Sequence, residues 1–277
     1  MARAHVECVH VDDLAWGPAE LPYSEGGCRQ KILSMDWDTR AASLYMQLDP
    51  GWRRPRGYHH ADTEYFVLEG DLTIEDKKLT RGCYFRAPKY LAVGPMHSEG
   101  GCTLLYYREG PPSFAVSQRN MGKITKQAVF VDTNEMEWGD IFVEGPPSGL
   151  QIKLLWMDEE TKAYSRLIRA LPGWTDTRLA HHPVMEEAFT LAGEMDYNFG
   201  HLAPGVYFYR PPRIKHGHFR AYESGTEWLI RCDGELVNLY TDENGKPENY
   251  DPNGDLAPLP AEPIRSVSLG EWDGDGR

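Results

Sequence analysis

The stretch Gly57-Tyr58-His59-His60-Ala61-Asp62-Thr63-Glu64-Tyr65-Phe66-Val67-Leu68-Glu69-Gly70 decides the fold of this chain. Residues 181–193 repeat its plan as His-His-Pro-Val-Met-Glu-Glu-Ala-Phe-Thr-Leu-Ala-Gly. Each copy has a histidine doublet, a carboxylate four residues past the second histidine, an apolar run typical of a strand, and a glycine. Histidine nitrogen and carboxylate oxygen together suit a borderline divalent metal such as iron(II), zinc, manganese or nickel. The sequence therefore predicts a metal-site scaffold that occurs twice.

The repeat extends well beyond the histidine doublet. Residues 31–64 align with residues 153–186 without a gap at an offset of 122, and 14 of the 34 pairs are identical. After the carboxylate the second copy gains one residue, and matches such as Gly70 with Gly193 continue at an offset of 123. Similarity of this extent is far above chance, so the chain is an internal duplication.

Both copies have the pattern of short β-strands. Residues 42–48 alternate between the two faces of a strand and end at the turn pair Pro50-Gly51. No stretch of 12 residues keeps a clean helical period, and turn signals recur along each copy. We predict an all-β fold of two tandem barrels, residues 1–115 and 116–240. The polar, Pro/Gly-rich tail, residues 241–277, cannot build a core.

Composition and charge narrow the class of protein. The 277 residues carry a net charge of −13, which argues against nucleic acid or an anionic membrane as a partner. The start of the chain has no apolar run typical of a signal peptide, and no later stretch suits a bilayer span. The five cysteines form no CxxC pair, so we expect reduced thiols and a cytoplasmic location.

The motif residues resemble those of a known family. A glycine, a histidine pair, a glutamate and a glycine are followed in the second copy by Gly205-Val206-Tyr207-Phe208-Tyr209-Arg210-Pro211-Pro212-Arg213-Ile214-Lys215-His216-Gly217. These stretches resemble the two cupin motifs, and the duplicated chain resembles a bicupin over roughly residues 5–240. The sequences of these motifs are similar to those of the small cupins of the acetylacetone-dioxygenase and anti-sigma-factor type. The resemblance implies jelly-roll barrels, each around a metal held by up to three histidines and one glutamate.

The histidine doublets depart from the cupin pattern, in which one residue separates two ligand histidines. Tyr58 and Ala180 stand where the first of these histidines is expected. Neighbours on a regular strand face opposite sides of the sheet, so one member of each doublet points inward unless a bulge turns both. The candidate ligands at the doublets and carboxylates are His59, His60, Glu64, His181, His182 and Glu186.

His60 and His182 are preferred within the doublets because they keep the family spacing to Glu64 and Glu186. Glu187 remains an alternative to Glu186, because the inserted residue blurs the register at this point. A histidine doublet can also be two surface histidines without a function. This interpretation is weakened because the doublet recurs with the same carboxylate in both copies.

The two copies differ at the later histidine. His216 of the second copy aligns with Val93, which cannot coordinate a metal. His182, Glu186 and His216 therefore form a two-histidine, one-carboxylate set, which leaves coordination positions open as non-haem iron(II) enzymes require. We predict that the second barrel holds the functional metal.

Three further residues stay open at this point. His97, four residues past Val93, replaces the missing ligand only if its strand shifts, and His218 is either an inward-facing residue or a solvent-facing one. Arg210, beside the Pro-Pro pair, is expected to be solvated, although a substrate-binding role is the alternative.

The resemblance implies a metal-dependent enzyme. We expect a non-haem iron(II) dioxygenase with dioxygen and a small diketone or hydroxyketone as its partners. Zinc, manganese and nickel are the alternative metals. A non-catalytic metal or ligand sensor and an isomerase or lyase are the alternative functions, and a homodimer is the candidate assembly. Cupins include many activities, so the fold does not choose among them.

Overall fold

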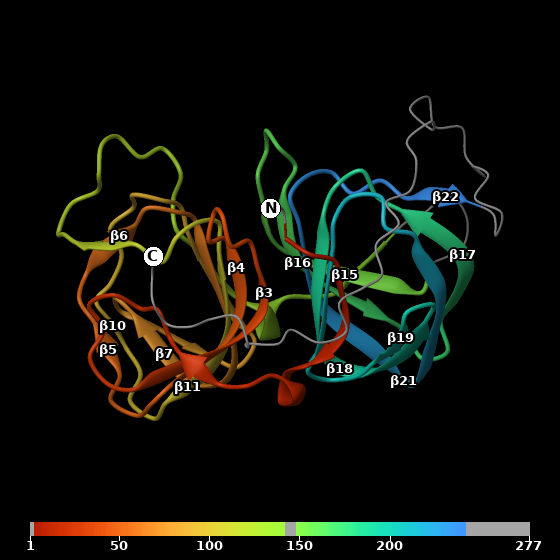
Figure 1. The fold of residues 1–277 in the computed structure, drawn as a ribbon, viewed down its shortest axis with the longest axis horizontal. Coiled ribbons are helices and arrows are strands. Elements are labelled where there is room, and N and C mark those ends of the chain that lie inside the picture. The colour runs from red at the N-terminus through yellow and green to blue at the C-terminus, as the bar shows by residue number, and fades with distance from the viewer. Residues whose placement is uncertain (1–2, 142–147, 242–277) are drawn as a thin grey trace. The chain divides into compact units, whose positions relative to one another are not determined.

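In the computed structural model, residues 3–141 and 148–241 are described (Figure 1). These residues divide into two compact units. The first unit consists of Arg3 and Leu14–Met136, and the second consists of Ala4–Asp13 and the described residues from Glu137 onward. The predicted tail lies outside the described residues from position 242 onward.

Antiparallel β-strands make up both units, and the described residues contain no α-helix. The helical segments among them are two short 3-10 turns, η1 (Val11–Asp13) and η2 (Thr133–Glu135). Within the same residues, no helix is long and apolar enough to cross a membrane. The predicted all-β fold is confirmed.

The strand bounds show the same succession of short elements in both units. The first unit contains β2 (Gly17–Pro18), β3 (Cys28–Met35), β4 (Ala42–Leu48), β5 (Arg53–Arg54), β6 (Gly57–His59), β7 (Thr63–Ile74), β8 (Lys77–Thr80), β9 (Cys83–Ala87), β10 (Met96–His97), β11 (Cys102–Arg108), β12 (Phe114–Val116) and β13 (Val129–Asp132). The second contains β1 (Val6–His10), β14 (Gly139–Asp140), β15 (Leu150–Met157), β16 (Tyr164–Ala170), β17 (Thr175–His181), β18 (Glu186–Tyr197), β19 (Gly200–Leu202), β20 (Val206–Arg210), β21 (His216–Cys232) and β22 (Leu239–Thr241).

The main sheets of the two units have the same strand order. The sheet of the first unit runs β13-β9-β7-β11-β4-β3-β2, and that of the second runs β1-β20-β18-β21-β16-β15-β14. Each strand of one sheet occupies the position that its counterpart occupies in the other, as an internal duplication requires. The prediction of two equivalent jelly-roll barrels is confirmed by this order.

The edge strand of each main sheet comes from the segment that precedes the other copy. Val6 of β1 and Val129 of β13 occupy corresponding positions, 123 residues apart. β1, which precedes the first copy, pairs with β20 of the second unit, and β13, which precedes the second copy, pairs with β9 of the first unit. Glu7 of β1 is thereby placed in the second unit, where its side chain is fully buried. The interior of the second unit therefore contains a carboxylate from the beginning of the chain.

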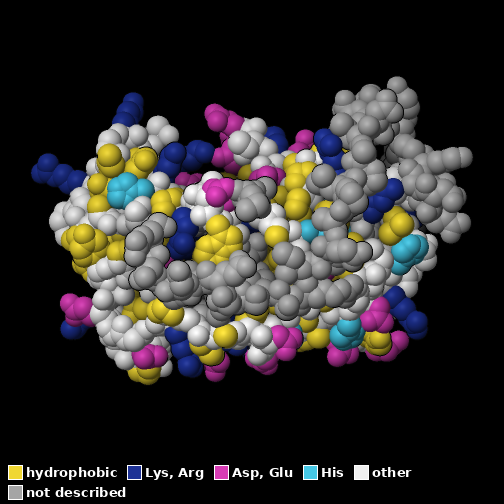
Figure 2. All heavy atoms as spheres, in the orientation of Figure 1, with side chains coloured by type: hydrophobic (Ala, Val, Ile, Leu, Met, Phe, Trp, Pro, Cys, Tyr) yellow, Lys and Arg dark blue, Asp and Glu magenta, His cyan; other side chains and the backbone are white. Residues whose placement is uncertain are grey.

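Alternation along the strands separates core from surface. In β4, the side chains of Leu44, Met46 and Leu48 are buried in the core of the first unit, and the residues between them are partly exposed. Ile168 of β16 and Ile230 of β21 belong to the core of the second unit. Burial of these apolar side chains stabilises each unit. On the face seen in Figure 2, basic and acidic side chains are interspersed rather than gathered in one field.

The glycine that closes each motif has a clear steric role. Gly70 and Gly193 both have positive φ, at 78° and 71°. A Cβ at either position would lie about 2 Å from a backbone carbonyl oxygen, that of Gly101 in the first unit and that of Gly225 in the second. Only glycine fits this close approach of strands, which explains why the repeat keeps it.

Candidate metal centre

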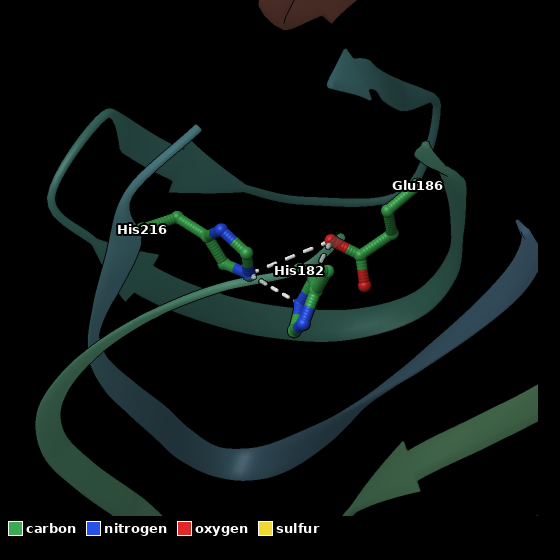
Figure 3. A group of neighbouring side chains, drawn as sticks. All are labelled: His182, Glu186 and His216. Carbon is green, nitrogen blue, oxygen red and sulfur yellow. Dashed lines mark hydrogen bonds and ion pairs between the residues drawn. The ribbon is translucent and has the colours of Figure 1, made fainter. Parts of the chain in front are cut away.

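Three predicted ligands of the second copy meet inside its barrel (Figure 3). His182 follows β17, Glu186 begins β18 and His216 begins β21, and the three residues are 5%, 7% and 4% exposed. The Nε2 atoms of the two histidines lie 3.2 Å apart, and Glu186 Oε2 lies 3.9 Å from His182 Nε2 and 3.5 Å from His216 Nε2. No other group of three or more such side chains clusters in this way within the described part of the chain.

Backbone carbonyls fix the tautomers of both histidines. His182 Nδ1 lies 3.1 Å from the Val237 carbonyl oxygen, and His216 Nδ1 lies 3.0 Å from that of Ile214. A carbonyl oxygen only accepts, so each Nδ1 carries the hydrogen and each Nε2 presents a lone pair. Histidines that bind metals are commonly oriented by such an N–H donor contact. Both Nε2 atoms are then hydrogen-bond acceptors, so neither can donate a hydrogen bond to the other.

The donor set fits a divalent metal. Burial, followed by the charge of Arg210, lowers the pKa of His216 to about 3, and burial lowers the pKa of His182, so both rings are neutral. Ligands that each lie about 2.0–2.2 Å from one ion are separated by about 3–4 Å from one another, and the three observed distances fall in that range. Two nitrogen lone pairs and a carboxylate oxygen therefore converge as metal ligands do.

A buried arginine orients the carboxylate of this cluster. Arg210 Nη1 donates to Glu186 Oε2 at 2.8 Å, while its Nε donates to Glu7 Oε1 at 2.6 Å. Burial alone raises the pKa of Glu186, but His182, His216 and Arg210 together lower it to about 2, so the carboxylate is ionised. The expectation that Arg210 is solvated was wrong, because its side chain is buried between two carboxylates.

Glu7 is in turn held by a network that sequence reasoning missed. His5 Nε2 lies 2.9 Å from Glu7 Oε1, and the Tyr197 hydroxyl donates to Glu7 Oε2. Glu7 and Arg210 are 203 positions apart and meet only because β1 pairs with β20. An acidic residue inside an otherwise apolar run is the one sequence signal that marks this buried carboxylate.

A second arginine faces the same interior from β16. Tyr164 and Ile168 belong to the core of the second unit, and alternation places Arg166, between them, on the same face. Its guanidinium carbon lies 4.1 Å from the ring centroid of Tyr164, and its charge is one of the causes that lower the pKa of His182, after burial. The buried Nε of Arg166 has no hydrogen-bond partner among the described residues. The charge of Arg166 on β16 therefore acts on the cluster.

Strand pairing identifies the corresponding residues of the first copy. Equivalent cross-strand pairs lie 123 residues apart in the two units: Gly57–Val93 with Ala180–His216, and Thr63–Ala87 with Glu186–Arg210. The extra residue of the second copy therefore precedes the histidine doublet, where β17 has an irregular register between Asp176 and Leu179. The gapless sequence alignment up to residue 64 was wrong by one residue here, because a bulge leaves no signature in residue type.

In this register the counterparts of the three clustered residues are His59, Thr63 and Val93. His59 is buried and its ring lies beside Phe114 and Tyr106, at centroid distances of 5.1 and 6.4 Å. Thr63 and Val93 are buried as well. The first unit thus keeps the counterpart of one of the three clustered side chains, a histidine, in its interior.

The structure does not bring the other candidates of the first copy together. His60 is exposed, and His97 lies partly exposed on β10. Glu64 faces away from the barrel interior, accepts a hydrogen bond from the Tyr84 hydroxyl at 2.8 Å and lies 3.6 Å from Arg86 Nε. These side chains belong to separate environments, and the weaker metal binding of the first barrel stays a prediction.

The remaining candidates of the second copy also lie outside the cluster. His181 is partly exposed on β17, and His218 is exposed with a positive φ of 53°. Glu187 accepts a hydrogen bond from the Tyr207 hydroxyl at 2.6 Å and pairs with Arg231. Glu187 is the structural counterpart of Glu64, which leaves Glu186 as the carboxylate that faces the histidines.

Comparison with known proteins places the chain in a family. Residues 7–239 match the family described as a domain of unknown function, DUF4437. The chain belongs to this family. No curated protein matches the sequence.

Several solved structures share the fold of this chain. A Nostoc punctiforme protein provisionally assigned as a dioxygenase has a TM-score of 0.70 at 18% identity, covering 87% of this chain and 83% of that chain. A glyoxylate-induced protein assigned in the same provisional way, from Pseudomonas aeruginosa, has a TM-score of 0.58 at 14% identity, covering 83% and 91%. Oxalate decarboxylase of Lactobacillus farciminis has a TM-score of 0.54 at 11% identity, covering 84% and 88%.

These likenesses show the fold, two cupin-type jelly-roll barrels in one chain. At identities below 20% they carry no activity across to this chain. The similarity to the acetylacetone-dioxygenase type stays a prediction.

Proposed function

We propose that this bicupin is a non-haem iron(II) dioxygenase that acts on a small diketone or hydroxyketone. One observation carries the proposal: two Nε2 lone pairs and one carboxylate oxygen converge in the second barrel, with three protein donors rather than the four of a closed structural zinc site. His182, Glu186 and His216 would hold the metal. Zinc, manganese or nickel suits the same donors, and iron is favoured because the dioxygen chemistry requires a redox-active ion.

The bound metal would supply Lewis acidity and open coordination positions for a chelating substrate and for dioxygen. The protein supplies the rest of the site. The carbonyls of Val237 and Ile214 hold the two imidazole rings in one orientation, and Arg210 holds the Glu186 carboxylate ionised and directed toward them. These supports preorganise the ligands before the metal arrives.

Arg166 extends the site toward the substrate. A diketone or hydroxyketone becomes an anion when it loses the proton of its enol, and the guanidinium of Arg166 would stabilise that negative charge. The aromatic ring of Tyr164 beneath the guanidinium and the apolar side chains of Phe208 and Ile230 line the same interior. An interior of this kind keeps bulk water from the reacting centre and strengthens the electrostatic contacts made there.

The test combines metal analysis with oxygen uptake. Protein purified without chelators is analysed for bound metals, then loaded anaerobically with iron(II) and mixed with a panel of β-diketones and hydroxyketones. We expect about one iron per chain and oxygen consumption with cleavage of at least one substrate. The matched variants are His216→Ala, which removes a clustered ligand, and His60→Ala, which removes an exposed histidine.

Two outcomes would replace the proposal. Tightly bound zinc with no oxygen uptake would indicate a metal or ligand sensor. Conversion of a substrate without oxygen consumption would indicate an isomerase or lyase.

A further inference from the structure

A groove of about 800 Å³ in the first unit reaches a buried arginine. Arg53 and Arg54 are neighbours on β5 and both line the groove, but their environments differ. Arg53 is exposed and its Nε donates to Glu25 Oε2 at 2.7 Å. Arg54 is only 2% exposed and forms no ion pair with any residue that the structure describes.

The contacts of Arg54 leave its charge uncompensated. Its Nη2 donates to the Tyr65 hydroxyl at 3.2 Å and to Met96 Sδ at 3.3 Å, and its guanidinium carbon lies 4.5 Å from the centroid of Phe114. The Nε and Nη1 atoms are buried and have no hydrogen-bond partner within the described ranges. Burying a cation without a counter-charge is unfavourable, so a site built in this way calls for an anion.

Two further buried residues with hydrogen-bond donors line the same groove. The hydroxyl of Ser98 has no partner among the described residues, and the indole Nε1 of Trp52 has only the Cys28 thiol, a weak acceptor, as a neighbour. An indole N–H only donates, and a serine hydroxyl can donate. Arg54, Trp52 and Ser98 are the buried residues with donor groups in the lining of the groove, and we call them its polar base. The acidic residues of the groove do not serve this base, because Glu25 is paired with Arg53 and Glu99 is exposed.

The walls of the groove indicate which kind of anion fits. Tyr23, Pro55, Pro95 and Met96 line it beside the polar base. Apolar walls around a few convergent polar groups are typical of sites for small organic ligands. An inorganic oxyanion would leave these walls without a partner, whereas the organic part of a carboxylate would cover them.

We infer that the first unit binds a small organic carboxylate in this groove, with Arg54 as the counter-charge and Trp52 Nε1 and the Ser98 hydroxyl as additional donors. The site is independent of the metal cluster of the second unit, since all of its residues belong to the first unit. It uses the copy that lacks two of the three metal-binding side chains. The duplication would thus have produced one metal-binding barrel and one anion-binding barrel.

Calorimetric titration of the full chain with benzoate, acetate and inorganic phosphate tests the inference. We expect benzoate to bind and to raise the melting temperature, and to bind more tightly than acetate or phosphate. Arg54→Met should abolish binding. Arg53→Gln is the matched control and should change the affinity less than twofold, because the charge of Arg53 is already paired. Ser98→Ala should weaken binding about tenfold, as expected for one hydrogen bond to a charged group.

The variant His216→Ala separates this site from the metal centre and should bind benzoate as the wild type does. Circular dichroism establishes that each variant is folded, and Ser98→Ala keeps the inference testable if Arg54→Met does not fold. Benzoate binding that survives Arg54→Met, or that is lost in His216→Ala, would overturn the inference. Absence of binding for all three anions, or tighter binding of phosphate than of benzoate, would overturn it as well.

Discussion

The two units of this protein have one strand order and two different interiors. At corresponding positions, the second unit has His182, Glu186 and His216, whereas the first has His59, Thr63 and Val93. The framework positions have been kept, including the closing glycines and the alternating core. Strand order depends on apolar alternation and turns, which many interiors satisfy, so the chemistry inside a barrel can change without a change of fold.

The comparison also shows how the second interior is supported. Arg210 corresponds to Ala87 of the first unit, and Arg166 corresponds to Leu44 at an offset of 122. The second unit thus has two inward-facing arginines near its carboxylate, where the first unit has two apolar side chains. A buried cation and a buried anion require each other, so these positions would have diverged together.

The largest expected effect comes from the third ligand. His216→Ala should reduce bound metal from about one per chain to none, because two remaining donors do not hold an ion firmly. The matched change Val93→Ala at the corresponding position of the first unit should leave the metal content unchanged. Metal analysis after dialysis measures both. Metal retained by His216→Ala and lost in Val93→Ala would reverse the assignment of the functional barrel.

Removal of Arg210 should cost the most stability. Arg210→Met leaves Glu7 and Glu186 buried without their shared cation, and breaking a buried ion pair in this way costs about 3–5 kcal/mol. Urea denaturation of the metal-free protein measures the loss. Arg178→Gln removes an arginine that is half exposed and serves as the control, with an expected change within about 0.5 kcal/mol. Equal effects of the two variants would show that the buried pair is not the cause.

Acid should destabilise the second unit through Glu186. The folded-state pKa of Glu186 is about 2, below its ordinary value of 4.5, so the folded state binds fewer protons than the unfolded state. Its stabilising contribution is complete above pH 4.5 and is lost as the pH falls toward 2, which amounts to about 3 kcal/mol. Urea denaturation of metal-free protein across this range measures the slope. In Glu186→Gln the slope should be smaller, and an unchanged slope would assign it to other groups, among them His182 and His216, whose pKa values are also lowered.

The duplicated barrel could be predicted from the sequence because it depends on local patterns. These patterns are the gapless repeat, the alternation along the strands and the recurring glycines. His182, Glu186 and His216 could be predicted because motif spacing along one strand and one hairpin carries the information.

The residues that could not be predicted depend on contacts between distant segments. Glu7 meets Arg210 only through the pairing of β1 with β20, and the position of the extra residue depends on a bulge in β17. Arg54 looks like its neighbour Arg53 in the sequence, and only the packing around β5 makes one buried and the other exposed.

A moderate effect is expected for Arg166, on the basis of the proposed activity. Arg166→Leu replaces it by the residue at the corresponding position of the first unit. We expect bound metal to be retained and kcat/KM for an enolisable substrate to fall about tenfold to a hundredfold, through loss of electrostatic stabilisation. Removing an unpartnered buried Nε should leave the free energy of unfolding equal or higher. Loss of the metal would instead assign Arg166 to the support of the ligands.

The smallest effect tests the register itself. Thr63→Glu combined with Val93→His restores, beside His59, the donor types of the second unit at the positions given by strand pairing. Because Ala87 stands where Arg210 orients Glu186, and because the charges of Arg54 and Arg108 act on His59, we expect only weak binding of a second metal. Its affinity should be about tenfold to a hundredfold lower than that of the natural site, since unsupported ligands commonly lose a factor of about 10–100.

Zinc titration monitored by calorimetry measures this second site, in a His216→Ala background that removes the first. The control is Val93→His alone, which leaves Glu64, the carboxylate proposed from motif spacing, as the alternative ligand. Glu64 faces away from the interior and is held by Tyr84 and Arg86, so the single variant should not bind zinc. If the single variant bound zinc as tightly as the double variant, Glu64 and not position 63 would correspond to Glu186. The extra residue of the second copy would then follow the carboxylate, and the correspondence between the two interiors would have to be redrawn.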